Sequence, residues 1–346
     1  MIDLWLIPLA ALVSFALTAG LRRYALARSI IDIPNARSSH SVPTPRGGGV
    51  AIVLAFLLAL PLLGWSHTVP YSSLVAIGGA GGIIAVIGFM DDHGHIAARW
   101  RLLGHFSAAA WALFWMDGLP LISLFGFGVN LGWIGSILAA VYLVWMLNLY
   151  NFMDGIDGIA SVEAISVCLG ACLLYWLSGV DGLLWLPLLL AMAVAGFLVW
   201  NFPPAKIFMG DAGSGFLGIA LGVMSIQAAW VSSQLLWAWL ILLGVFIVDA
   251  TFTLVRRLVR GDKVYEAHRS HAYQFASRSF GNHLSVTLGV AVINLLWLLP
   301  IALCVILLEV DGTWGLILAY APLVALAVKY HAGELEGADV ADGGNT

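Results

Sequence analysis

Residues 73–92 read SLVAIGGAGGIIAVIGFMDD, an uncharged and mostly apolar run that ends in two aspartates. A helix that crosses the hydrocarbon core of a bilayer needs about 20 predominantly apolar residues. The run therefore predicts a transmembrane helix, with Asp91 and Asp92 at the point where the chain leaves the membrane.

The rest of the chain has the same character. Of its 346 residues, 61% are hydrophobic and 10% are charged, whereas soluble domains contain about 25% charged residues. This composition excludes a soluble single-domain enzyme, a disordered chain and an extracellular disulfide scaffold. The formal net charge of -4 gives no indication of nucleic-acid binding.

The apolar segments recur along the chain, and they predict an all-α polytopic integral membrane protein with about eleven transmembrane helices. We expect residues 1–332 to form a single transmembrane domain, and residues 333–346 to form a disordered cytoplasmic tail. The segments lie near residues 3–21, 48–64, 73–90, 102–117, 132–148, 159–178, 183–200, 213–230, 235–255, 284–308 and 313–330.

The fifteen Lys and Arg residues all follow odd-numbered segments. Because Lys and Arg mark cytoplasmic loops, we predict an N-out, C-in topology with catalytic loops on the cytoplasmic side. The first segment is followed by Arg22, Arg23 and Arg28, not preceded by them, which is the reverse of a cleaved signal peptide. The segments without Lys or Arg are residues 65–72, 118–131, 179–182, 231–234 and 309–312, and 118–131 has the composition of a short re-entrant or strand-like piece.

Two clusters of acids and amides lie at predicted cytoplasmic ends of helices. Asp91-Asp92 could hold a divalent cation or accept a proton, and it could also be a solvated loop end. Residues 148–158, NLYNFMDGIDG, place two Asn and two Asp at three-residue intervals without a basic partner. Such oxygens favour metal or nucleotide-sugar contact, with an ordinary turn as the alternative.

Two further clusters carry basic residues. In residues 201–214, NFPPAKIFMGDAGS, Lys206 offers a phosphate partner and Asp211 is either a magnesium ligand or a helix N-cap. In residues 265–274, YEAHRSHAYQ, the basic side chains suit an anionic diphosphate or lipid head groups. Zinc is disfavoured there because no Cys is near.

The first predicted cytoplasmic loop, residues 32–49, contains hydroxyls, His40, two Arg and a glycine run. This composition is typical of a phosphate-contact segment or of a flexible linker. All five clusters fall on the same predicted face of the membrane, where they combine acids for a metal with bases for phosphate.

Together these motifs resemble the polyprenyl-phosphate N-acetylhexosamine-1-phosphate transferase superfamily, of the MraY and WecA type, and most closely its O-antigen-initiating WbpL branch. Asp91-Asp92 is similar to the paired aspartates of that family, and residues 148–158 to its Asn-x-x-Asn-x-x-Asp-Gly-x-Asp-Gly motif. Residues 208–214 are similar to its Gly-Asp-x-Gly-Ser signature. The motifs cover about residues 30–280, and hydropathy covers the rest.

The resemblance implies transfer of an N-acetylhexosamine 1-phosphate from its UDP conjugate to undecaprenyl phosphate, with release of UMP and a requirement for Mg²⁺ or, as a substitute, Mn²⁺. It implies a start to lipopolysaccharide O-antigen or related glycan assembly in a bacterial inner membrane, with the site facing the cytoplasm. A homodimer is compatible with it. The sugar, GlcNAc or a 6-deoxy HexNAc such as FucNAc or QuiNAc, cannot be read from motifs.

The resemblance also implies roles for individual residues. Asn151 and Asp211 would bind the metal, Asp91 would be the base for the acceptor phosphate and Asp92 its support. The other implied catalytic residues are Asp154, Asp157, His268 and His271. The implied substrate-binding residues are Arg37, His40, Arg46, Asn148, Asn201, Lys206, Phe208 and Arg269.

The chain departs from the family pattern in two places. His93-Gly94-His95 stands where the family often carries an acid or Lys, so no role is carried over to these residues, and residues 268–271 interrupt a run of histidines. Two alternatives stay open: a secondary transporter of an anionic substrate, for which an acid such as Asp249 is typical, and a Mg-dependent intramembrane prenyltransferase, which needs two separated Asp-x-x-x-Asp motifs.

Overall fold

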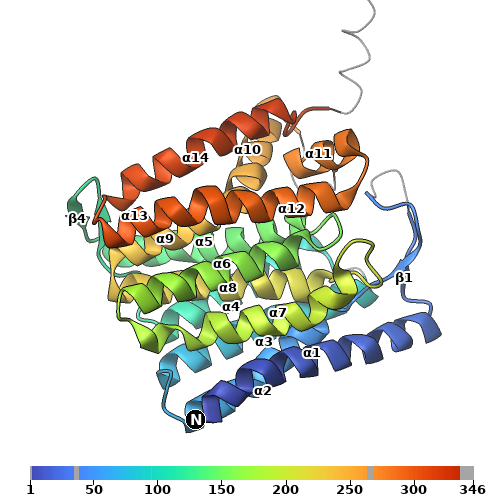
Figure 1. Ribbon diagram of the computed structural model, residues 1–346, viewed down its shortest axis with the longest axis horizontal. Coiled ribbons are helices and arrows are strands. Elements are labelled where there is room, and N and C mark those ends of the chain that lie inside the picture. The colour runs from blue at the N-terminus through green and yellow to red at the C-terminus, as the bar shows by residue number, and fades with distance from the viewer. Residues whose placement is uncertain (1, 35–38, 95, 263–267, 336–346) are drawn as a thin grey trace, which may run out of the picture.

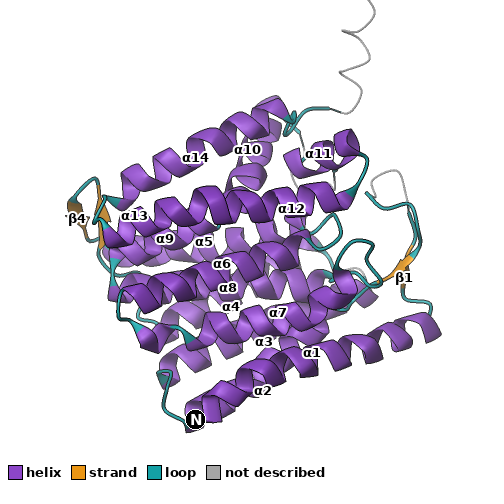
Figure 2. Ribbon diagram, in the orientation of Figure 1, coloured by secondary structure: helices purple, strands orange, loops and turns teal. Residues whose placement is uncertain are grey.

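The computed structural model describes residues 2–34, 39–94, 96–262 and 268–335. Arg37, His95 and the expected tail residues 336–346 lie outside the described residues. Long helices run roughly side by side and form one bundle (Figure 1), and loops and short strands are confined to its ends (Figure 2).

The described part of the chain is mostly α-helical. The helices are α1 (Ile2–Ala27), α2 (Val50–Trp65), α3 (Tyr71–His93), α4 (Ala98–Trp115), α5 (Gly132–Met153), α6 (Ile159–Leu177), α7 (Trp185–Asn201), α8 (Asp211–Val231), α9 (Ser233–Leu242), α10 (Gly244–Arg260), α11 (Ala272–Phe280), α12 (His283–Ile293), α13 (Leu299–Leu307) and α14 (Gly312–Lys329). A 3-10 turn, η1 (Asp181–Leu183), precedes α7, and a π-helical turn, η2 (Asn294–Leu298), joins α12 to α13.

Two short antiparallel pairs of strands complete the described elements. Strands β1 (Ile31–Asp32) and β2 (Thr44–Pro45) pair within the first loop. Strands β3 (Ile122–Leu124) and β4 (Phe127–Val129) form a hairpin between α4 and α5. Segment 118–131 is thus strand-like, which was one of its two expected forms.

The apolar helices confirm an all-α polytopic membrane protein. Among the described residues, eight helices are long and apolar enough to cross a membrane, and the α9–α10 pair, bent by 72°, brings the number to nine. Each of the eleven expected segments overlaps a helix, but α2 is short and α4 does not meet this criterion. The count of eleven and the orientation therefore stay predictions.

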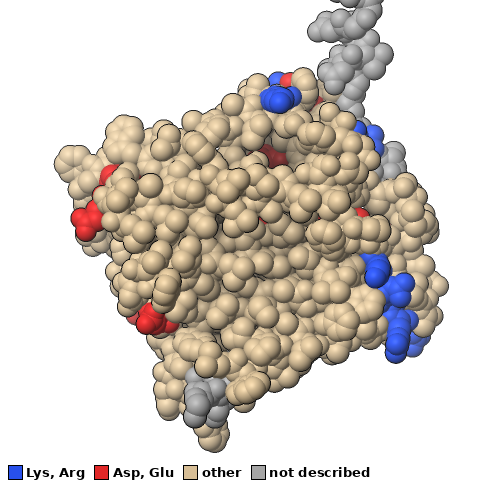
Figure 3. Space-filling view, in the orientation of Figure 1, with Lys and Arg blue, Asp and Glu red and all other residues tan. Residues whose placement is uncertain are grey.

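Charged side chains are distributed unequally between the two ends of the bundle. On the face shown in Figure 3, Lys and Arg gather at the end that carries β1 and α11, and only acids are seen at the opposite end. We call the first of these the charged end. It is where α3 and α5 finish and α8 begins.

Helix α8 lies in the middle of the bundle, where small residues let its neighbours approach closely. A Cβ atom added to Gly218 would lie 2.5 Å from the Cα atom of Leu147 in α5, and one added to Gly88 in α3 would lie 2.5 Å from the backbone nitrogen of Ala212. These contacts bring the ends of α3 and α5 to the beginning of α8. Asp92, Asn151 and Asp211 meet there as a result.

The first loop is attached to the segment that precedes α8. The backbone N–H of Phe208 donates to the carbonyl oxygen of Pro45 at 2.8 Å, and the N–H of Gly48 donates to the carbonyl oxygen of Phe208 at 2.9 Å. At the other end of the chain, the N–H of Gly333 donates to the Ser270 carbonyl at 2.6 Å. The charged end is therefore built from segments that are far apart in sequence.

Candidate active site

Asn151 and Asp211 are in direct contact. Asn151 belongs to the last turn of α5, and its Nδ2 donates to Oδ1 of Asp211 at 2.8 Å and to Oγ of Ser214 at 3.0 Å. Asp211 is the first residue of α8. The structure thus brings together the two residues that the resemblance implies as metal ligands.

Asp92 is buried, with 5% of its surface exposed, and its carboxylate caps α8. Oδ1 accepts a hydrogen bond from the backbone N–H of Asp211 at 3.2 Å, and Oδ2 accepts one from Ala212 at 3.4 Å. Arg46 Nη2 donates to the Asp92 carbonyl oxygen at 2.6 Å. A carboxylate at a helix N-terminus satisfies unpaired N–H groups and interacts favourably with the helix dipole. Asp92 therefore holds Asp211 in place.

Asp91 points to a different side of Asp211, into a small cavity of about 50 Å³ that Asn148, Asn151 and Asp211 also line. Its Oδ1 accepts from the backbone N–H of Ile96 at 2.9 Å, and its Oδ2 forms an ion pair with Arg101 of α4. Sequence reasoning missed Arg101 as a site residue. Its position ten residues after Asp91, near the start of the next predicted helix, was the available signal.

Asn148 and His105 line the same small cavity. The Nδ2 atom of Asn148 donates to the Val144 carbonyl at 2.7 Å and lies 3.5 Å from Nδ1 of His105. Asn148 is therefore one helical turn from Asn151 but faces the Asp91 side of the site.

A larger acidic cavity of about 270 Å³ lies on the other side of Asp211. It collects most of the predicted site residues, namely His40, Arg46, Asp92, Asn151, Asp154, Asp157, Asn201, Phe208 and Asp211. Burial raises the pKa of Asp154 well above its usual value, and the negative charges of Asp211, Asp92 and Asp157 raise it further. Crowding of these carboxylates disfavours their simultaneous ionisation, and a bound cation would offset that repulsion.

Asp157 is held by α12 and by the loop before α8. Its Oδ1 lies 3.2 Å from Nδ1 of His283, and its Oδ2 accepts from the backbone N–H of Ala205 at 3.0 Å. Burial alone would raise the pKa of Asp157, but the hydrogen bonds from His283 and Ala205 outweigh it, so the pKa is lowered. Sequence reasoning missed His283, because a single His at the start of an apolar helix carries no motif.

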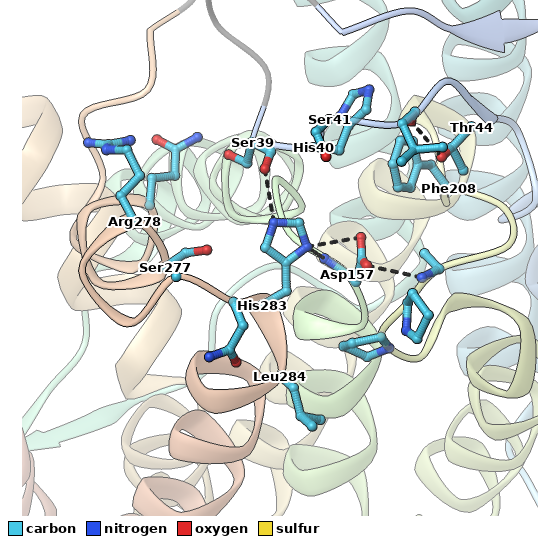
Figure 4. Close-up of a pocket in the computed structure, with 17 residues that line it drawn as sticks. Ser39, His40, Ser41, Thr44, Asp157, Phe208, Ser277, Arg278, His283 and Leu284 are labelled. Carbon is cyan, nitrogen blue, oxygen red and sulfur yellow. Dashed lines mark hydrogen bonds and ion pairs between the residues drawn. The ribbon is translucent and has the colours of Figure 1, made fainter.

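A wider pocket of about 610 Å³, which we call the outer pocket, adjoins the acidic cavity and shares His40, Asp157, Phe208 and His283 with it. The rings of His40 and Phe208 meet edge to face, with centroids 4.8 Å apart. Figure 4 shows residues of the first loop above this pocket and His283 in its centre.

Two of the predicted substrate-binding residues have other contacts. The side chain of Asn201 accepts from the Gly158 N–H at 3.1 Å and donates to the Ile207 carbonyl at 3.1 Å, so it joins two loops of the site. Lys206 is exposed, and its Nζ lies 5.6 Å from the centroid of the Trp200 ring. It lines neither the acidic cavity nor the outer pocket.

His268 and His271 do not line these two cavities. Their rings stack on each other with centroids 4.9 Å apart, and Nδ1 of His271 lies 3.2 Å from Oδ1 of Asp249 in α10. Asp249 also accepts from the backbone N–H groups of Ala272 and Tyr273, each at 3.0 Å. Asp249, the acid named for the transporter alternative, therefore accepts backbone N–H groups at the start of α11.

His268 is neutral at physiological pH, because burial, followed by the charges of His271 and Arg257, lowers its pKa to about 3. It would thus contact an anion as a neutral hydrogen-bond partner and not as a cation. Arg269 is half-buried, and its carbonyl oxygen accepts from Nη1 of Arg278 at 3.4 Å.

The bundle and its site define a multi-pass membrane protein with an oxygen-rich cavity at the charged end of its helices. Residues 74–229 match glycosyl transferase family 4. The chain is 31% identical over 287 residues to a Bacillus subtilis protein named "Probable undecaprenyl-phosphate N-acetylglucosaminyl 1-phosphate transferase", covering 81% of this chain and 78% of that protein.

Other bacterial relatives carry related names. A decaprenyl-phosphate N-acetylglucosaminephosphotransferase of Mycolicibacterium smegmatis is 33% identical over 75% of this chain and 73% of its own length. A phospho-N-acetylmuramoyl-pentapeptide-transferase of Moorella thermoacetica is 33% identical over 53% of this chain and 61% of its own length. The chain belongs to glycosyl transferase family 4, the superfamily of polyprenyl-phosphate N-acetylhexosamine-1-phosphate transferases.

Proposed function

We propose that this protein transfers an N-acetylhexosamine 1-phosphate from a UDP-sugar to undecaprenyl phosphate and releases UMP. Its relatives indicate N-acetylglucosamine-1-phosphate transfer to a polyprenyl phosphate. The observation that carries the proposal is the meeting of Asn151 and Asp211 between the acidic cavity and the small cavity that contains Asp91. One cavity can receive a soluble donor while the other faces a second reactant.

The donor set at Asn151 and Asp211 fits Mg²⁺, with Mn²⁺ as a substitute. Mg²⁺ is bound through one or two carboxylates together with substrate phosphates and water, so it does not require a larger set of protein ligands. Among the described residues, no group of three or more His, Cys, Asp or Glu side chains is suited to a metal. The Asn151 amide now turns its nitrogen toward Asp211, so it must rotate to offer its oxygen. When bound, the ion would neutralise charge on the donor diphosphate.

The residues around the acidic cavity would bind and orient the donor. His40 and Phe208 offer an aromatic wall shared by both cavities, and Arg46 lines the acidic cavity near the backbone of Asp92. The outer pocket, at about 610 Å³, has the volume that small-molecule sites commonly have. We place the diphosphate beside Asp211 and the rest of the donor in the outer pocket.

Asp91 would act on the acceptor phosphate. The guanidinium of Arg101 stabilises its carboxylate form, and a deprotonated carboxylate is what a general base requires. In a single in-line displacement, an acceptor phosphate oxygen forms a bond to the sugar-linked phosphorus. The bond from that phosphorus to the bridging oxygen breaks, and UMP leaves with that oxygen and its electron pair. A phosphorylated enzyme isolated with UDP-sugar alone would favour double displacement instead.

We propose that the enzyme lies in a bacterial inner membrane with the charged end in the cytoplasm, where UDP-sugars are found. It would start O-antigen or related glycan assembly, as in the WbpL branch, with GlcNAc or a 6-deoxy HexNAc such as FucNAc or QuiNAc as the sugar. A homodimer is compatible with this role.

The function is tested by measuring UMP release from the purified protein with undecaprenyl phosphate, Mg²⁺ and a panel of UDP-N-acetylhexosamines. We expect at least one donor to support release only when the acceptor is present. Asp211→Ala and Asp91→Asn should each abolish most of it. Normal turnover in both variants would contradict the site, and substrate uptake into sealed vesicles without UMP would favour a transporter.

A further inference from the structure

His283, the first residue of α12, joins two loops at the charged end. Its Nε2 lies 3.0 Å from the carbonyl oxygen of Ser39 in the first loop, and its Nδ1 lies 3.2 Å from Oδ1 of Asp157 in the loop between α5 and α6. Figure 4 shows the ring between these two partners, at the centre of the outer pocket. The three residues come from segments more than a hundred positions apart.

The imidazole suits this position in either charge state. The Ser39 carbonyl can only accept, so Nε2 must carry a proton. Nδ1 faces the Asp157 carboxylate and also lies 3.4 Å from the Asp157 backbone N–H. The protonated ring can donate to the carboxylate, and the neutral ring can accept from the N–H. The bridge to Ser39 is therefore kept in both states.

His283 contacts the first loop at a residue between its two strands. The returning part of this loop is attached to the Phe208 segment through Pro45 and Gly48, and its two strands pair at Asp32 and Thr44. Ser39 and His40 lie on the far side of those strands, and both line the outer pocket. His283 therefore connects this part of the loop to Asp157, which lines the same pocket.

We propose that His283 is a positioning residue for the donor: it latches the first loop over the outer pocket and so holds His40 against Phe208. This inference rests on the proposed function only for the identity of the ligand. The contact that forms the latch, between His283 and Ser39, is proposed for the protein without substrate. His283 acts through Ser39 and need not touch the reacting atoms.

Two substitutions separate the contacts that the ring makes. In His283→Asn the amide nitrogen takes the place of Nδ1, so it keeps the Asp157 side and loses Ser39. In His283→Gln the amide nitrogen can take the place of Nε2, so it keeps Ser39. The matched control is His67→Asn at the opposite end of the bundle, where φ is 56° and Asn is tolerated.

The latch is read directly by a nitroxide spin label at Val42→Cys, whose native side chain is 66% exposed. The background carries Cys304→Ser, because Cys304 is exposed while Cys168 and Cys172 are buried. Without any substrate, the label should become more mobile in His283→Asn and should change little in His283→Gln and His67→Asn. Equal mobility in His283→Asn and the unsubstituted background would overturn the proposal.

Steady-state kinetics then measure how loss of the latch affects binding of the donor. Loss of one hydrogen bond to the loop should raise KM for UDP-N-acetylglucosamine about fivefold in His283→Asn, while KM for undecaprenyl phosphate and kcat change by less than about twofold. His283→Gln should restore most of the donor KM. A fall in kcat with an unchanged donor KM would contradict a positioning role. If the unsubstituted protein released no UMP, the proposed function would fail, and the spin label would still decide the latch.

Discussion

The carboxylate of Asp92 accepts a hydrogen bond at 3.2 Å from the backbone N–H of Asp211, across 119 positions of sequence. The end of α3 thereby caps the beginning of α8 and fixes the carboxylate proposed to bind Mg²⁺. The same helix end carries Asp91, whose side chain is paired with Arg101 on the other side of the site. Two adjacent aspartates thus have different tasks because their side chains leave the helix in different directions.

The cap predicts that Asp92→Ala destabilises the protein more than Asp92→Asn. Loss of a side-chain cap costs about 0.5–2 kcal/mol, and Asn retains one acceptor oxygen for the N–H of Asp211. Thermal unfolding of the purified variants in detergent measures the difference. Equal melting temperatures for the two variants would show that the cap contributes little to stability.

The ion pair between Asp91 and Arg101 predicts that Arg101→Met lowers the rate of UMP release by about tenfold or more, because it leaves a carboxylate without its partner. Arg99→Met is the matched control, since Arg99 lies two residues away against the ring of Trp100. In a double-mutant cycle, Asp91→Asn should remove most of the effect of Arg101→Met. Additive losses would contradict direct coupling.

The hydrogen bonds to Asp157 predict a stability that depends on pH. The folded-state pKa of Asp157 lies below the usual value of an aspartate, so the unfolded chain binds the proton more readily. This contribution is complete above the unfolded pKa and is lost as the pH falls through the folded pKa. Unfolding measured from pH 6 downwards should show a loss below about pH 4 that is reduced in Asp157→Asn. The same pH dependence in both proteins would refute this assignment.

The close approach of α5 and α8 predicts that Gly218→Ala is destabilising. The added Cβ would lie 2.5 Å from the Cα atom of Leu147 and 2.5 Å from the carbonyl oxygen of Met146, and overpacking of this kind costs about 1–3 kcal/mol. Gly82→Ala is the control, because no atom lies within 4 Å of its added Cβ. Unfolding in detergent should separate the two variants, and equal stability would show that the helices can move apart freely.

The apolar segments could be predicted from the sequence because hydrophobic length is a local property, as residues 73–90 show. The resemblance to the family implied Asn151 and Asp211 as a pair, and their side chains are in direct contact. The directions of the side chains at the helix ends could not be predicted from the sequence. His271 lies against Asp249 instead of in the acidic cavity, and Lys206 lies against Trp200.

Contacts between distant loops also could not be predicted from the sequence. His283 has no neighbouring motif that would mark it, and its partners Ser39 and Asp157 lie 244 and 126 positions away in the sequence. The sequence shows Arg101 as one of the basic residues after the third apolar segment. Its pairing with Asp91 depends on how α4 turns back against α3.

The proposed reaction moves a phosphosugar from a nucleotide to a lipid. It is tested most directly by incubating the purified protein with UDP-N-acetylhexosamine labelled in the β-phosphate, undecaprenyl phosphate and Mg²⁺. We expect the label to move to the lipid together with the sugar, with one UMP released for each lipid product. Neither should occur in Asp211→Ala or after chelation of the metal. Label that remains in the nucleotide, or lipid labelled equally well by Asp211→Ala, would contradict it.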